Sequence, residues 1–149
     1  MLRLGRKYPD LFTAEGWADK IGALFDENDV GMLTAIVSLL LAMTAVNPKP
    51  FEVLQKKAIP TLGKIVVNRV CPKDYFYYSM GNPWLQVKLL RFLQYYGAPE
   101  DTTMKAKLNE ILKKILASAE IAKGQTVNHK NSLNAVLFEA IQLVIHLDE

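Results

Sequence analysis

Hydrophobic positions are densest in three segments of the chain, and the central one spans residues 82–96. Asn82 is a favourable N-cap, and Pro83 suits the first helical position because its missing N–H is not needed there. Gly97 and Pro99 provide the signals that end the helix. A helix that is apolar on most of its surface must be covered on most sides. The segment therefore predicts a helix with a neighbouring helix on either flank.

Residues 30–47 and 131–146 have the same strongly apolar character and predict two further helices. Asp29 is the candidate N-cap of the first of them. Thr34, Ser38 and Ala45 form a narrow strip of small side chains on that helix. We expect another helix to approach closely along this strip.

A more amphipathic segment precedes each apolar one, and each such segment predicts a helix with one buried stripe. These segments span residues 17–26, 51–70 and 101–118. Pro60 lies inside the second and should kink or split it, because proline removes one internal hydrogen bond. We expect residues 71–81 and 119–130 to be irregular. The predicted buried stripes are, in chain order, Trp17, Ile21, Leu24 and Phe25 in the first segment, Phe51, Leu54, Ala58, Leu62 and Ile65 in the second, and Met104, Leu108, Ile111 and Ile115 in the third.

The three apolar segments align without gaps, at offsets of 52 and then 48 residues. The unit that repeats is an outer amphipathic helix followed by an inner apolar one. Helical repeats of about 40 to 47 residues are typical of HEAT and armadillo proteins. The sequence therefore predicts an all-α fold, a HEAT/armadillo-like α-solenoid of about three helix pairs, in which stacked neighbours bury the inner helices. The aligned positions carry Leu33, Leu85 and Leu133, then Val37, Leu89 and Leu137, then Leu41, Leu93 and Ile141.

The start of the chain reads as the end of a preceding unit, because Met1–Tyr8 resembles a helix tail that Pro9 and Asp10 break. We therefore expect residues 1–149 to be a single segment of a solenoid that is truncated at both ends.

Composition and charge narrow the function classes without choosing one. The chain has 149 residues, of which 22% are charged, and a net charge of +3, which is too small to indicate nucleic-acid binding. A single cysteine, Cys71, fits a reducing compartment. No signal peptide is visible, and the longest apolar-dominated run, residues 35–46, is too short to span a membrane. These features predict a soluble, intracellular protein.

Candidate chemistry is sparse. His129 and His146 lie too far apart in sequence for a local metal motif, and Cys71 has no local partner. No phosphate-binding glycine motif occurs, and no acid, base and nucleophile form a recognisable constellation. The sequence therefore predicts a protein that is not an enzyme and that has no catalytic residue, metal site or cofactor.

Two features could bind a protein partner. Lys88 and Arg91 lie on one side of the central helix, where they form either an exposed edge of the inner face or a docking site for an acidic segment. The aromatic cluster at residues 75–78 either covers the end of a neighbouring helix or forms a peptide-binding surface. The residues alone leave both pairs of interpretations open.

Residues 71–78, with residues 83–91 after them, resemble the adaptins, the large subunits of clathrin adaptor complexes. Residues 134–141 resemble the matching segment of the next adaptin repeat, and the likeness extends over nearly the whole chain. The tyrosine cluster and the Pro83–Trp84 pair favour the alpha adaptins of adaptor protein complex 2 over the gamma adaptins. Gly81 and Asn82 depart from the family pattern, which changes the helix cap and not the fold.

The resemblance implies a trunk segment of the large subunit, a scaffold without catalytic activity. An alpha adaptin holds a small sigma subunit and assembles with beta and mu subunits for clathrin-mediated endocytosis and intracellular protein transport. It would lie in the cytoplasm, peripheral to the plasma membrane in clathrin-coated pits. Clathrin and phosphoinositides would bind other parts of the full-length protein, so the resemblance transfers no binding residue to this chain. The alternative is another HEAT/armadillo-type solenoid, such as a transport receptor or an RNA-binding repeat protein.

Overall fold

The computed structural model describes residues 16–27, 29–118 and 125–148. These residues form a helical fold in which a two-stranded antiparallel hairpin is the one sheet described. The predicted helix tail at residues 1–8 lies outside the described residues. The elements are α2 (Trp17–Leu24), α3 (Val30–Thr44), η2 (Lys49–Leu54), α4 (Gln55–Val66), η3 (Lys73–Tyr75), β1 (Phe76–Tyr77), β2 (Met80–Gly81), α5 (Pro83–Leu93), α6 (Thr102–Ala117) and α7 (Val127–Asp148).

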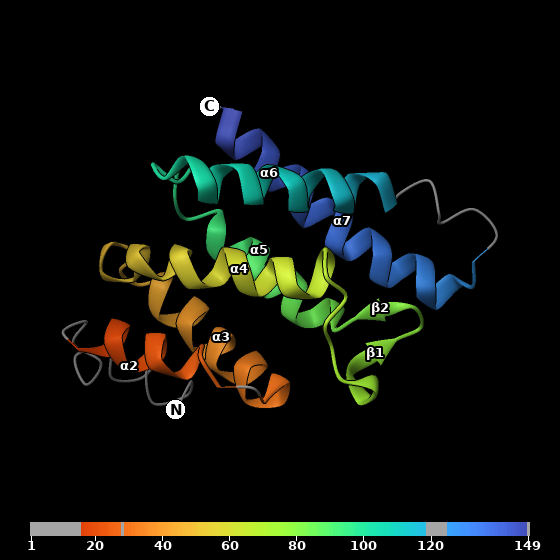
Figure 1. Cartoon of the computed structure of the whole chain (residues 1–149), viewed down its shortest axis with the longest axis horizontal. Helices are drawn as coiled ribbons and strands as arrows, with labels where there is room; N and C mark the ends of the chain where they lie inside the picture. Colours follow the sequence, from red (N-terminus) through yellow and green to blue (C-terminus); the bar gives the residue numbers. More distant parts are fainter. Residues whose placement is uncertain (1–15, 28, 119–124, 149) are drawn as a thin grey trace.

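The helices stack in three tiers, with α2 and α3 at one end, α4 and α5 in the middle, and α6 and α7 at the other end (Figure 1). Along one layer α5 packs between α3 and α7, and along the other α4 contacts both η2 and α6. Each inner helix also packs against the outer helix that precedes it in the chain. This arrangement confirms the predicted all-α solenoid of outer and inner helices.

Asparagine and aspartate side chains cap the N-termini of three helices. The sequence predicts two of these caps, Asp29 and Asn82. Asp29 Oδ1 accepts a hydrogen bond from the Met32 N–H (2.7 Å), and Asp101 Oδ1 accepts one from the Thr103 N–H (2.7 Å). Asn82 Oδ1 accepts from the Leu85 N–H (3.1 Å). Each bond satisfies one of the N–H groups that the first helical turn leaves without a partner.

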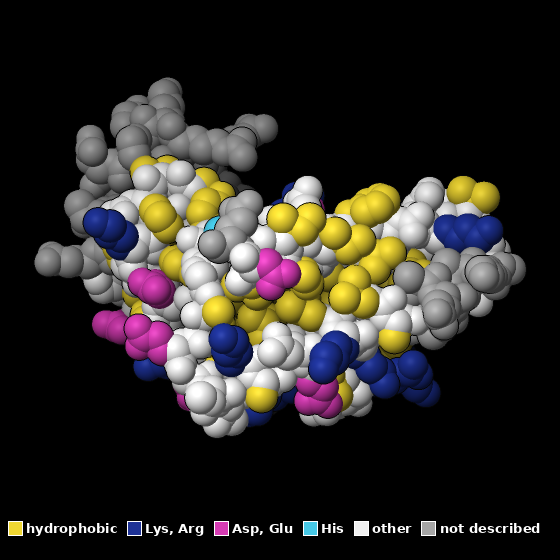
Figure 2. Space-filling view, turned by 90° about the horizontal axis from the view of Figure 1, so that it is seen from above, with side chains coloured by type: hydrophobic (Ala, Val, Ile, Leu, Met, Phe, Trp, Pro, Cys, Tyr) yellow, Lys and Arg dark blue, Asp and Glu magenta, His cyan; other side chains and the backbone are white. Residues whose placement is uncertain are grey.

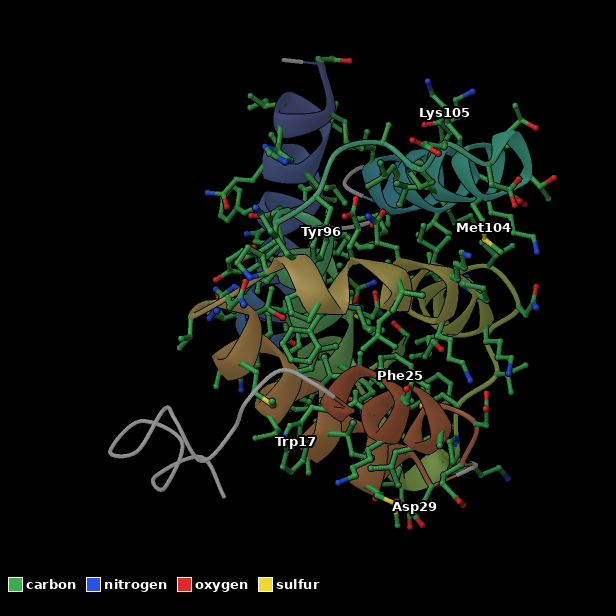
Figure 3. The ribbon with its side chains drawn as sticks, turned by 90° about the vertical axis from the view of Figure 1, so that its left-hand side faces the viewer. Trp17, Phe25, Asp29, Tyr96, Met104 and Lys105 are labelled. Atoms are coloured by element: carbon green, nitrogen blue, oxygen red, sulfur yellow. The ribbon has the colours of Figure 1, made fainter. Side chains whose placement is uncertain are left out.

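The core lies between the two layers and follows the predicted stripes closely. All five positions of the predicted stripe in residues 51–70 are buried: Phe51, Leu54, Ala58, Leu62 and Ile65. In α6, Leu108, Ile111 and Ile115 are buried, while Met104 is half-buried against the core. Figure 3 shows Lys105 pointing away from the molecule, whereas its neighbour Met104 lies on the side that faces α4.

Four details differ from the sequence-based expectations. Helix α4 runs through Pro60 without a split, and the change of helix type comes earlier, where the 3-10 helix η2 meets Gln55. Residues 71–81 are not wholly irregular, since they contain η3 and the hairpin β1–β2. Helix α7 begins at Val127, inside the range expected to be a loop. Leu24 is exposed, although helical spacing placed it on the buried stripe of α2.

Candidate functional site

The predicted strip of small side chains on α3 is where α5 approaches, and Lys88 reaches into the contact. Its Nζ donates to Ser38 Oγ (2.6 Å) and to the Thr34 carbonyl oxygen (3.4 Å). The side chain is half-buried, and burial lowers the pKa of Lys88 because a charged ammonium loses hydration there. No described carboxylate pairs with it. Lys88 therefore links two inner helices through neutral oxygen acceptors.

Asn82 makes a second polar link between the same helices. Its Nδ2 donates to Thr34 Oγ1 (3.0 Å), while its Oδ1 caps α5. The residue is buried and has a left-handed backbone, with φ of 35°. Asparagine tolerates this conformation better than most residues. The side chain thus starts α5 and fixes its position on α3 at the same time.

Arg91 lies on the other flank of α5, where it contacts α7. Its Nε donates to Glu139 Oε1 (2.6 Å), and Gln94 Nε2 donates to Glu139 Oε2 (3.0 Å) and to the Glu139 carbonyl oxygen (3.1 Å). The Glu139 side chain is 12% exposed, while that of Arg91 is 59% exposed. Each carboxylate oxygen accepts one of these bonds, so a largely buried charge is paired and hydrogen-bonded.

Two aromatic residues of the hairpin segment, Tyr77 and Tyr78, pack on the first turns of α5 and α7, as one of the two interpretations expects, while peptide binding at the exposed rings stays a prediction. The Tyr77 ring lies edge-on to Trp84 (5.1 Å between centroids), and the Tyr78 ring stacks on His129 (5.6 Å). His129 is buried and holds the hairpin through Ser79 Oγ, 3.2 Å from its Nε2. Its Nδ1 lies 2.9 Å from Gln125 Oε1. The histidine is thus a structural link between the hairpin and α7.

The structure gives Lys88 and Arg91 partners inside the chain and places them on opposite flanks of α5. Docking of an acidic segment at these residues stays a prediction. Sequence reasoning did not find the Arg91–Glu139 pair, although one signal was present. The two residues are 48 positions apart, which is the second repeat offset, so opposite charges occupy equivalent positions of adjacent inner helices.

The part of the chain that the structure describes offers little for chemistry. Its histidine, cysteine and carboxylate side chains do not cluster into a group that could hold a metal ion. Burial raises the pKa of Cys71, which makes the reactive thiolate less accessible at neutral pH. None of the described helices is long and apolar enough to cross a membrane. The features with clear geometry are therefore contacts between repeats.

All 149 residues match the family model described as the adaptin N terminal region. The chain belongs to this adaptin family. It is 49% identical over 148 residues to the AP-2 complex subunit alpha-2 of Dictyostelium discoideum. It is 42% identical to the AP-2 complex subunit alpha-1 of Arabidopsis thaliana and 34% identical to the AP-2 complex subunit alpha of Schizosaccharomyces pombe. The expected likeness to alpha adaptins is confirmed.

The identity with an AP-1 complex subunit, gamma-2 of Arabidopsis thaliana, is lower at 27%, as the aromatic segment and the Pro83–Trp84 pair indicate. The alignments to the three AP-2 subunits cover 99% to 100% of this chain, but the chain spans only 14% to 17% of those relatives. Membership of the adaptin family removes the support for a transport receptor or an RNA-binding repeat protein.

Proposed function

We propose that this chain is a non-catalytic scaffold segment of the large alpha subunit of an AP-2-type clathrin adaptor complex. The observation that carries the proposal is the 49% identity, over 99% of the chain, to a protein named as an AP-2 complex subunit alpha. The stacked helix pairs support it, because stacked helical repeats present an extended surface on which other subunits can bind.

The contacts on both flanks of α5 suit a scaffold. Lys88 and Asn82 fix α5 on α3, and Glu139 fixes α7 on α5 through Arg91 and Gln94. Polar bonds with defined geometry set the rotation of one helix against the next, which apolar packing alone leaves less specified. A partner that contacts two tiers would therefore meet a surface of constant shape.

The partners in this proposal are the small sigma, beta and mu subunits of the complex. The complex would act in the cytoplasm at the plasma membrane, in clathrin-coated pits, where it serves endocytosis and intracellular protein transport. Clathrin and phosphoinositide membranes would be contacted by other parts of the full-length protein. We assign no nucleic-acid partner, in keeping with the modest net charge.

We also propose that residues 1–149 are one segment of a longer trunk. The share of the relatives that the chain spans supports this idea. So does α7, which leaves Phe138 (63%), Ile141 (38%) and Ile145 (57%) exposed at helical spacing. Figure 2 looks onto the molecule from the side of α6 and α7 and shows hydrophobic side chains gathered across the middle of that face.

The test is assembly of the full-length protein that contains this chain. Tagged full-length protein, purified from its own cells, should bring down sigma, beta and mu subunits, and fluorescent protein should concentrate in clathrin-coated pits. Recovery of the full-length protein without these subunits would overturn the proposal. If it were recovered with RNA instead, and the affinity persisted at moderate salt, an RNA-binding solenoid would replace it.

A further inference from the structure

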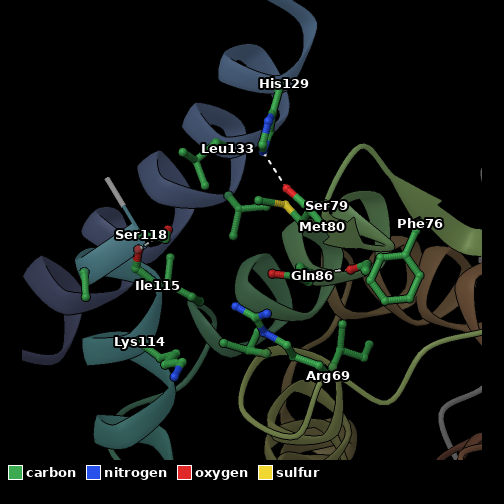
Figure 4. A pocket seen from close by; sticks show the side chains of 15 residues that line it. Arg69, Phe76, Ser79, Met80, Gln86, Lys114, Ile115, Ser118, His129 and Leu133 are labelled. Carbon is green, nitrogen blue, oxygen red and sulfur yellow. Dashed lines mark hydrogen bonds between the residues drawn. The ribbon is translucent and has the colours of Figure 1, made fainter. Parts of the chain in front are cut away.

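A cavity of about 340 Å³ opens where α4, the hairpin β1–β2, α5, α6 and α7 meet (Figure 4). Ile65, Ile115, Leu133 and Val136 contribute apolar side chains to its wall. Arg69 and Lys114 contribute positive charge. Lys88, Asn82 and Arg91 lie outside this lining. His129 and Ser79, which link the hairpin to α7, are part of it.

The charged side chains among the described residues of the lining are all basic. Of the described residues that line the cavity, none is acidic, and neither Arg69 nor Lys114 forms an ion pair with a described carboxylate. Figure 4 shows the Arg69 side chain reaching toward the centre of the residues that line the cavity, with Lys114 below Ile115. His129 uses both ring nitrogens on Ser79 and Gln125. The two unpaired cations are therefore the groups available to an anion.

One residue that lines the cavity, Arg69, has an unfavourable backbone conformation. Among the described residues other than glycine, three have a positive φ: Arg69 at 54°, Tyr78 at 55° and Asn82 at 35°. Arg69 lines the cavity, Tyr78 precedes the lining residue Ser79, and Asn82 follows the lining residue Gly81. A long side chain in this conformation is unfavourable, and glycine would fit better. Tyr78 lies in the turn of the hairpin and Asn82 caps α5, so Arg69 is the residue whose conformation bears on the cavity.

We propose that this cavity binds a peptide segment of another protein in which a large apolar side chain stands next to a carboxylate. The apolar walls would cover the apolar side chain. The planar guanidinium of Arg69 can hold a carboxylate by two parallel hydrogen bonds, with Lys114 as a second cation. A volume of about 340 Å³ is near the lower end of ligand pockets, which suits one or two side chains.

A free anion suits the cavity less well. Inorganic phosphate would meet Arg69 and Lys114 but would leave the apolar walls in contact with water. The peptide would cover the apolar walls with its apolar side chain and pair its carboxylate with the two cations. Peptide binding in the cavity does not depend on assembly of an adaptor complex. The peptide-binding proposal can therefore be disproved while the proposed function stands, and the proposed function can be disproved while peptide binding stands.

The probes are fluorescein-labelled peptides of glycine and serine with a central leucine, methionine or phenylalanine flanked by two glutamates. Binding to the full-length protein, with the partners it purifies with, is followed by fluorescence polarisation. We expect saturable binding for at least one of them. Replacing its glutamates by glutamines, or its apolar residue by serine, should weaken binding by about tenfold or more. Inorganic phosphate should compete only weakly.

Two variants and one matched control link the binding to the cavity. Arg69→Gly should weaken binding by about tenfold or more, while its melting temperature stays equal or rises because the strained backbone relaxes. Lys114→Ala should weaken binding too. Its neighbour Lys113 is also exposed on α6 but does not line the cavity, so Lys113→Ala should bind as the unmodified protein does. If Arg69→Gly did not fold, Lys114→Ala against Lys113→Ala would decide.

Several results would overturn the proposal. They are no saturable binding below about 1 mM, equal affinity for the glutamate and glutamine peptides, and equal losses in Lys113→Ala and Lys114→Ala. Unchanged affinity in a folded Arg69→Gly would also overturn it. Full displacement of the peptide by phosphate would reduce the cavity to a general anion site.

Discussion

Helix α5 has an inner helix on each flank, α3 and α7, whereas α7 packs on α5 and α6 and keeps a long stripe of its surface exposed. The aligned positions of the two helices show what this difference does. Leu93 is 3% exposed in α5, and the equivalent Ile141 is 38% exposed in α7. Leu89 is fully buried, while Leu137 is half-buried. The repeat pattern thus determines which side chains can be buried. The neighbouring helices determine how much of each of these side chains is buried.

Truncation of the aligned leucines should give the largest effect. Leu89→Ala should lower the free energy of unfolding by about 2–5 kcal/mol, because it removes a fully buried side chain and leaves a cavity. Leu137→Ala should lower the free energy of unfolding clearly less than Leu89→Ala does, because the Leu137 side chain is already partly exposed to water. Urea unfolding of the 149-residue chain measures both.

The control for this pair is Lys107→Ala on the outer helix α6. Lys107 is exposed, so the change should stay within about 0.5 kcal/mol of neutral. If Lys107→Ala cost as much as Leu89→Ala, the assignment of inner and outer helices would be wrong. Equal costs for Leu89→Ala and Leu137→Ala would show instead that the open face of α7 does not matter energetically.

A smaller effect is expected at the contact that joins the two helices. Glu139→Ala should lower the free energy of unfolding by about 1–3 kcal/mol, because Arg91 loses its acceptor, Gln94 keeps only the backbone carbonyl oxygen, and the neighbourhood is largely buried. Arg91→Ala leaves a carboxylate without its charged partner. A double-mutant cycle of Arg91→Ala and Glu139→Ala should therefore give a coupling energy of at least about 0.5 kcal/mol. Additive effects would mean that the pair does not link α5 to α7.

A smaller loss of stability than at Glu139 is expected at Tyr96, which ties the end of α5 to the turn between α3 and η2. Tyr96 is buried and its hydroxyl donates to the Pro48 carbonyl oxygen (2.8 Å). Tyr96→Phe should cost about 1 kcal/mol, since one hydrogen bond is lost and the packing is kept. Denaturant unfolding near pH 8 measures this, and a cost near zero would show that the bond contributes nothing net.

The same variant tests an effect of pH. Burial raises the pKa of Tyr96 from 10.0 to about 12, because it disfavours the charged phenolate. The unfolded chain then loses this proton at lower pH than the folded one, so the contribution of Tyr96 is fully present below pH 10.0 and is lost toward about pH 12. Between these values the stability of Tyr96→Phe should fall less steeply. Equal slopes would show that Tyr96 titrates normally.

Much of the fold follows from local signals. The caps at Asp29 and Asn82, the buried stripe from Phe51 to Ile65 and the small-residue strip on α3 all lie where the pattern indicates. These features are set within one or two helical turns, so the sequence carries them almost completely. The repeat alignment adds which helices are inner ones.

The polar contacts could not be obtained in the same way. His129 reads as an isolated histidine, yet the fold buries it against Tyr78 and Ser79, which lie 51 and 50 positions away. The hairpin is equally hard to foresee, because two-residue strands have too few positions to show alternation. The cavity beside it depends on four helices and the hairpin at once.

The sequence by itself determined the class of fold, the order of outer and inner helices and, through its resemblance, the adaptin family, because helical periodicity and repeat spacing are local and additive signals. Only the tertiary structure decided which equivalent leucines are buried, that Glu139 receives Arg91 and Gln94, and that Arg69 and Lys114 share a cavity. Those outcomes depend on which surfaces meet across distant parts of the chain. Contacts of that kind are a property of the packed stack and are not encoded in any one segment.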